Sequence, residues 1–163
     1  MPVPNIYTAG QILEATSLNT NFASVFYGYT AFTPTMTGWT QGNATFNTQY
    51  AVSGETVHYY GEMVMGSTSA VTVSALALSL PVAANTSPPH WGFGTWIDVS
   101  AGVSVAGRVQ VAVPLASTML TYWEDPEAAP LAVRLEPWNT SVVLPFTFAT
   151  GDYFRWNLFY RKA

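Results

Sequence analysis

Beyond residue 28 the chain alternates apolar and polar side chains, and a period of two is the pattern of strands with one face buried. The last segment, 153–161, shows it most clearly. Phe154, Trp156, Leu158 and Tyr160 occupy every second position, and Arg155, Asn157 and Arg161 face the other way. A helix would scatter these four side chains around its circumference. The pattern therefore predicts a final strand with one buried face.

The same alternation recurs through most of the chain. Segments 44–52 and 55–65 alternate on either side of Ser53 and Gly54, which predicts a hairpin with a tight turn. Further strands are expected at 71–80, 92–99, 103–113, 117–123, 131–136 and 142–148. About nine or ten short strands at roughly 8–12-residue spacing are typical of all-β domains. We expect an antiparallel β-sandwich or jelly roll.

The first 28 residues have a different character. Residues 1–7 contain two prolines and predict an extended arm, and Thr8 with Gln11 resembles a helix capping box. Leu18, Phe22 and Phe26 then recur at helical spacing as one apolar stripe. We expect an arm and attachment helix in 1–28 and a β-sandwich domain in 29–163. The stripe either packs on its own sandwich or docks on a neighbouring chain, and the shortness of the helix favours docking.

Charged residues are scarce. They make up 9% of the chain, where about 25% is typical. The first cation is Arg108, and the net charge is −4. Nucleic-acid binding and polybasic membrane binding both need a basic surface, so neither is expected. A surface with so few charges favours coverage by identical chains or by other proteins, which predicts a homo-oligomer.

The N-terminal sequence has no positively charged region and no continuous apolar run, so we expect no secretory signal. No window approaches the roughly 20 apolar residues of a membrane-spanning helix. The chain contains no cysteine, which excludes disulfides and thiolate metal sites. These features predict a protein made in a cytoplasm and not inserted in a membrane.

Several segments resemble proteins of tailed-bacteriophage virions. Residues 1–28, which we call the head of the chain, contain a Gly-x-x-Leu-x-Ala segment at 10–15. It leads into Leu-Asn-x-x-Phe at 18–22, a pattern common near the start of such proteins. Segments 29–34, 54–58, 66–68, 78–82 and 145–152 are similar to β-sandwich domains of minor tail, tail-fibre and head-decoration proteins. The resemblance implies a virion structural protein, commonly trimeric, that binds other virion proteins. In the same segment, Leu18, Asn19, Phe22 and Phe26 are the candidate docking residues.

No catalytic or metal motif stands out. His58 and His90 are the only histidines, and alternation places His58 on the polar side of a strand as a hydrogen-bonded sheet histidine. Glu124, Asp125 and Glu127 form an acidic loop, but they lack the spacing of a calcium-binding loop. We expect no enzyme activity, no cofactor and no metal ion.

The six tryptophans offer a different kind of site. Trp156 lies on the apolar face of the last strand and is expected in the core. Trp123 and Trp138 flank the acidic loop, where aromatic rings with Glu124 and Asp125 could contact another molecule. Core or subunit packing and glycan stacking are both open at these positions, with packing favoured.

Together these features predict a bacteriophage virion structural protein of the tail or fibre apparatus. It would assemble as a homotrimer through its N-terminal segment and display a β-sandwich that could contact a host cell-surface glycan. A capsid decoration protein is the first alternative, and a carbohydrate-binding module is the second.

Overall fold

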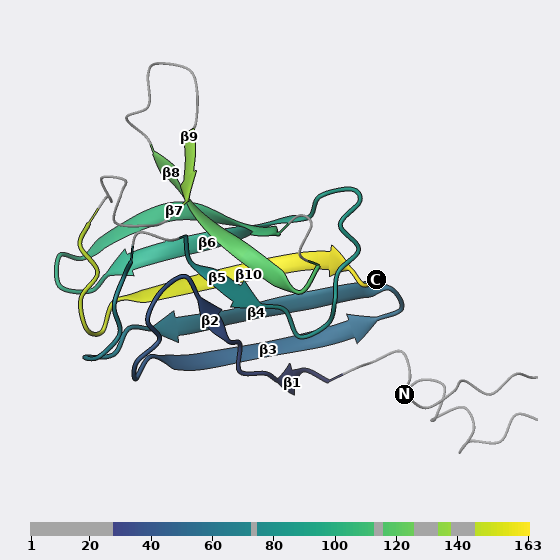
Figure 1. Ribbon diagram of the computed structural model, residues 1–163, viewed down its shortest axis with the longest axis horizontal. Helices are drawn as coiled ribbons and strands as arrows, with labels where there is room; N and C mark the ends of the chain where they lie inside the picture. The colour runs from purple at the N-terminus through teal and green to yellow at the C-terminus, as the bar shows by residue number, and fades with distance from the viewer. Residues whose placement is uncertain (1–27, 73–74, 113–115, 126–133, 138–145) are drawn as a thin grey trace, which may run out of the picture.

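A computed structural model describes residues 28–72, 75–112, 116–125, 134–137 and 146–163 (Figure 1). Within these residues there are strands and no helix, which confirms the all-β class. The predicted arm and helix of residues 1–27 lie outside the described part. The ten strands are β1 (Thr30–Ala31), β2 (Met36–Thr37), β3 (Thr45–Ser53), β4 (Thr56–Val64), β5 (Ala77–Ser79), β6 (Trp91–Asp98), β7 (Val103–Val111), β8 (Thr118–Asp125), β9 (Arg134–Pro137) and β10 (Tyr153–Arg161).

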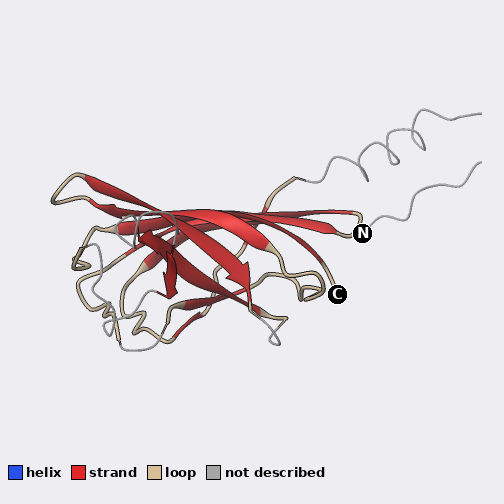
Figure 2. Ribbon diagram, turned by 90° about the horizontal axis from the view of Figure 1, so that it is seen from above, coloured by secondary structure: helices blue, strands red, loops and turns tan. Residues whose placement is uncertain are grey.

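The strands form one antiparallel sheet in the order β1-β3-β4-β10-β6-β7-β8-β5-β2, and β9 pairs with β8 beside this path. The two end strands, β1 and β2, are consecutive in the sequence and are joined only by residues 32–35. The sheet must therefore curl until its ends meet. Figure 2 shows the long strands in one layer, with shorter strands and loops beneath them. The expected sandwich is thus a single sheet folded over its own core.

The hairpin of β3 and β4 is confirmed. Ser53 pairs with Thr56, so the two-residue connection is Gly54 and Glu55, one residue later than expected. Gly54 has a φ of 58°, the left-handed conformation that such a turn requires and that glycine adopts without strain. The turn therefore fixes the register of every side chain along both strands.

The core lies between the two halves of the curled sheet, as alternation predicts for the long strands. Every second residue of β4 and β10 points inward, and the folded-over strands cover this face from the other side. Trp156, expected in the core, is buried there. The largest fully buried side chains are Trp96, Tyr59, Tyr160, Phe154, Met63, Leu76, Leu78, Met119, Leu158, Val57 and Val109.

Two expected strands differ from the structure. Among the described residues of segment 71–80, only Ala77–Ser79 form a strand, and before it the Thr72 hydroxyl donates to the carbonyl oxygen of Gly38. Such side-chain bonds to backbone compete with a strand ladder. Of segment 142–148, residues 146–148 are not a strand, although Phe146 and Phe148 pack against the core. Apolar residues alone did not distinguish a packed loop from a strand.

Two buried carboxylates hold the turns at one end of the sheet. Asp152 accepts hydrogen bonds from the backbone N–H groups of Val99 (2.9 Å) and Ala149 (2.7 Å). Asp98 accepts from the backbone of Ala101 and the hydroxyl of Ser100, and these bonds lower the pKa of Asp98. Both acids serve the fold, because their oxygens bind the turns that they close.

Two core tyrosines provide a matched test of buried hydrogen bonding. The Tyr160 hydroxyl donates to the carbonyl oxygen of Val82 at 2.8 Å, whereas the buried Tyr59 hydroxyl has no partner among the described residues. Burial raises the pKa of both, so both are neutral. Tyr160→Phe should lower the free energy of unfolding by about 1 kcal/mol, and Tyr59→Phe should leave it unchanged or raise it. Urea denaturation followed by circular dichroism measures both; a larger loss in Tyr59→Phe would contradict this account.

Candidate functional site on the outer face of the sheet

The outer face is the side of β3, β4, β10 and β6 that points away from the core. Strand register arranges its side chains in rows that cross the sheet, and three of these rows form the site. The first row is Asn47, Glu62, Arg155 and Thr95; the second is Gln49, Tyr60, Asn157 and Phe93; the third is Ala51, His58 and Phe159. The rows bring together residues that lie far apart in the sequence, because β10 is inserted between β4 and β6.

One end of the outer face carries exposed aromatic rings, which we call the aromatic strip: Tyr29, Trp91, Phe93 and Phe159. Their exposed fractions are 49%, 43%, 76% and 56%. The other exposed large apolar side chains among the described residues are Val99 and Val103, near the β6–β7 turn. Aromatic rings exposed together on one surface mark an interaction site more often than scattered single ones do.

His58 ties the edge of the strip to the sheet. Its ring stacks on Phe159 at a centroid distance of 4.1 Å, and its Nδ1 lies 2.8 Å from the Tyr29 hydroxyl. Its Nε2 lies 3.0 Å from the Asn157 amide oxygen. Both ring nitrogens thus have partners, which confirms His58 as a hydrogen-bonded sheet histidine. These contacts fix the orientation of two rings of the strip.

The charges of the outer face are paired within the sheet. Arg155 Nε donates to Glu62 Oε2 at 2.6 Å, and Arg161 lies 2.7 Å from Glu55. The hydrogen bond to Glu62 raises the pKa of the Arg155 guanidinium, so this side chain stays a cation. Arg155 is balanced by a carboxylate of β4 and Arg161 by a carboxylate of the β3–β4 turn, so these two cations add little net charge to the face.

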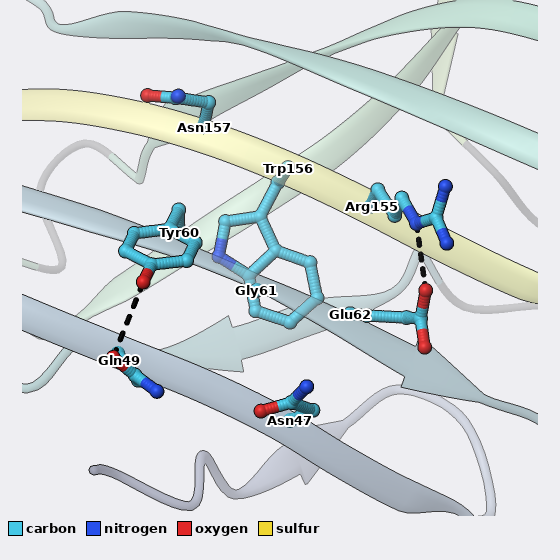
Figure 3. Close-up of a pocket in the computed structure, with 8 residues that line it drawn as sticks. All are labelled: Asn47, Gln49, Tyr60, Gly61, Glu62, Arg155, Trp156 and Asn157. Atoms are coloured by element: carbon cyan, nitrogen blue, oxygen red, sulfur yellow. Dashed lines mark hydrogen bonds and ion pairs between the residues drawn. The ribbon is translucent and has the colours of Figure 1, made fainter.

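A pocket of about 390 Å³ lies beside the aromatic strip, between β3, β4 and β10 (Figure 3). Gly61 has no side chain and, with the buried Trp156, completes the lining below a ring of polar groups. That ring consists of Asn47, Gln49, Tyr60, Glu62, Arg155 and Asn157. The volume falls within the range of small-molecule sites, roughly 300–1,000 Å³.

Much of the hydrogen-bonding capacity of the pocket is unused. The Tyr60 hydroxyl donates to the Gln49 amide oxygen at 3.1 Å, which leaves the Gln49 amide nitrogen without a partner among the described residues. The side chain of Asn47 makes no hydrogen bond to any described residue. Asn157 uses its oxygen on His58 and keeps its amide nitrogen free within the same set. These amide groups could bind a polar ligand.

The site residues predicted from sequence are elsewhere. Leu18, Asn19, Phe22, Phe26 and Trp138 lie outside the described residues. The backbone of Trp123, Glu124 and Asp125 forms the end of β8, and their side chains also lie outside the described part. There β8 pairs with β9, and this hairpin projects from the sheet (Figure 1). The proposed contact role of these residues stays a prediction.

Sequence reasoning missed the outer face, although one signal was available. In 153–161 the outward positions are polar except for Phe159, and an exposed aromatic ring among polar residues indicates a contact. Phe93 gave a weaker signal, because glycines flank it on both sides. The pocket gave none, since its six polar residues come from three strands.

No group of three His, Cys, Asp or Glu side chains that could hold a metal ion occurs among the described residues. That part of the chain also contains no helix long and apolar enough to cross a membrane. Comparison with protein-family models, with curated proteins and with solved structures gives no match. The sequence and the geometry of the outer face are therefore the two sources of information on function.

Proposed function

We propose that this chain is a structural component of a bacteriophage virion, part of the tail or fibre apparatus. Its N-terminal segment attaches it to the particle, and its β domain presents the outer face to the host surface. The observation that carries the proposal is this face, where the exposed aromatic strip lies beside a polar pocket and the charges are paired. Such a surface is built for contact with another molecule.

Two features of the sequence support the same proposal. The head resembles phage virion proteins at Leu18, Asn19 and Phe22, and the chain has few charges to keep identical copies apart. We propose that copies assemble as a homotrimer through this head. The β domain would then leave its outer face available. The alternative is a capsid decoration protein, since an N-terminal attachment segment and a displayed β domain would serve that role equally well.

The experiment is to find the chain on the particle. Mass spectrometry of purified virions should detect it, and immunogold electron microscopy should place the label on the tail or fibres. Label on the capsid would favour the decoration protein instead. Absence from purified particles would contradict the virion role and leave the carbohydrate-binding module as the better reading.

The oligomer provides a second prediction. Native mass spectrometry of the full-length protein should show three chains, and a variant with Leu18→Ser, Phe22→Ser and Phe26→Ser should shift to one chain, because polar side chains remove the apolar stripe. Val99→Ser is the control, since it removes an exposed apolar side chain on the β domain and should leave the trimer intact. A trimer that survives the triple change would contradict assembly through the head.

A further inference from the structure

We infer that the pocket on the outer face binds an uncharged sugar, with the aromatic strip as a stacking platform beside it. This inference rests on the proposed function, because it gives the displayed face a ligand. The two can fail separately: sugar binding is measured on the isolated protein, and the virion role is measured on the particle.

The free groups of the pocket match hydroxyl groups. A side-chain amide offers both donors and an acceptor, and a sugar hydroxyl also donates and accepts. Asn47 and Gln49 stand on β3 and Asn157 on β10, with β4 between the two strands, and each amide has capacity left among the described residues. Neighbouring strands lie about 4.8 Å apart, so β3 and β10 hold the amides roughly 10 Å apart across the pocket. That span suits a ring with hydroxyls on opposite edges.

The charge of the pocket selects against ionic ligands. Arg155 and Glu62 are its only charged lining residues, and they form an ion pair of 2.6 Å. A phosphate or carboxylate that approached Arg155 would also meet Glu62, and an ammonium group would meet Arg155. An uncharged polyol can accept a hydrogen bond from Arg155 and donate one to Glu62 without breaking the ion pair. The electrostatics therefore favour a neutral sugar over a nucleotide or an acidic peptide.

The aromatic rings supply the apolar half of the site. Phe93 on β6 stands opposite Asn157 on β10, and Phe159 lies two residues after Asn157 on β10. Both exposed rings therefore adjoin the edge of the pocket. A pyranose has faces of C–H groups and a rim of hydroxyls. It can lie against an aromatic ring while its rim reaches the amides. Polar side chains around the pocket, next to exposed aromatic faces, fit this ligand.

The location in the sheet argues against a peptide strand as the ligand. The pocket lies over β3, β4 and β10, and β4 and β10 have both backbone edges paired with neighbouring strands. Addition of an extended peptide needs a free edge. Over β4 and β10, recognition must therefore come from side chains, whereas β3 pairs with β1 only at Gln49 and Tyr50.

The test is saturation-transfer NMR on the full-length protein with glucose, galactose, mannose, rhamnose and N-acetylglucosamine, followed by calorimetric titration of the best binder. We expect millimolar binding of at least one of them, because the pocket is open to solvent. Glucuronic acid and glucosamine serve as charged comparisons and should bind more weakly. No binding by any neutral sugar, or preference for a charged one, would overturn the inference.

Asn47→Ala is the decisive variant. The Asn47 side chain has no hydrogen bond to the described residues, so its loss should not affect folding. Affinity should fall about tenfold, the effect of roughly 1.4 kcal/mol of lost hydrogen bonding. Thr45→Ala is the matched control. Thr45 is exposed on the same face of β3, two residues before Asn47, and lies outside the pocket lining. The sugar affinity of this variant should not change.

Phe93→Ala and Phe159→Ala test the platform. Each should weaken sugar binding several-fold and leave the oligomeric mass unchanged. Sugar affinity unchanged in Asn47→Ala and in both ring variants would overturn the inference. A change in oligomeric mass without sugar binding would also overturn it, because the strip would then be a contact between copies.

Discussion

Trp96→Ala should lower the free energy of unfolding by about 3–5 kcal/mol, which could unfold a domain of ordinary stability. Trp96 is fully buried on β6 and stacks on Phe154 at 3.9 Å between ring centroids. It also contacts the rings of Trp39 (6.1 Å) and Phe148 (5.5 Å). Its indole N–H donates to the Tyr122 carbonyl oxygen at 3.3 Å. The change removes all of these contacts and leaves a cavity.

The control is Phe93→Ala, three residues earlier on the same strand. Phe93 points outward and is 76% exposed, so its loss should change stability by less than about 0.5 kcal/mol. Urea denaturation followed by far-UV circular dichroism suits both variants, because that signal comes mainly from the backbone. Similar losses in the two would contradict the assignment of the inner and outer faces of β6.

Gly92→Ala is the second change with a large expected effect. An added Cβ at this position would lie 2.4 Å from the carbonyl oxygen of Asn157 and 2.9 Å from the Cα of Leu158. Both atoms belong to the backbone of β10, so relief requires the two strands to separate. We expect a loss of about 1–3 kcal/mol in unfolding free energy, the usual range for overpacking.

Gly28→Ala is the matched control, because an added Cβ there meets nothing within 4 Å. It should leave the unfolding midpoint in urea nearly unchanged. Backbone amide exchange adds a local test: in Gly92→Ala, amides of β6 and β10 should exchange faster than those of β3. Uniform exchange across the sheet would contradict a local clash between β6 and β10.

The sequence predicted the long strands well, and the reason is local. In β10 and β4, alternation alone separates the buried face from the exposed one, since a strand that is buried on one side needs a period of two. Pairing across a two-residue turn also follows from neighbouring residues, as in the β3–β4 hairpin. The strand predicted at 71–80 was too long, because the strand at 77–79 exists only where β2 and β8 lie beside it.

The candidate site could not be predicted in the same way. Glu62 and Arg155 are 93 residues apart and meet only because β10 lies between β4 and β6. Nothing in either strand specifies that neighbour, since the backbone hydrogen bonds of an antiparallel pair are the same for any two strands. From the sequence, only residues close in the chain could be grouped, such as the tryptophans near the acidic loop.

By itself the sequence determined an all-β domain, the two faces of its long strands and a surface poor in charge. The tertiary structure decided the strand order, the curl that joins β1 to β2 and the rows of the outer face. The physical reason is that alternation is set by each strand, whereas neighbours are chosen by the packing of the whole core. The aromatic strip and the polar pocket exist only because the tertiary structure places particular strands side by side.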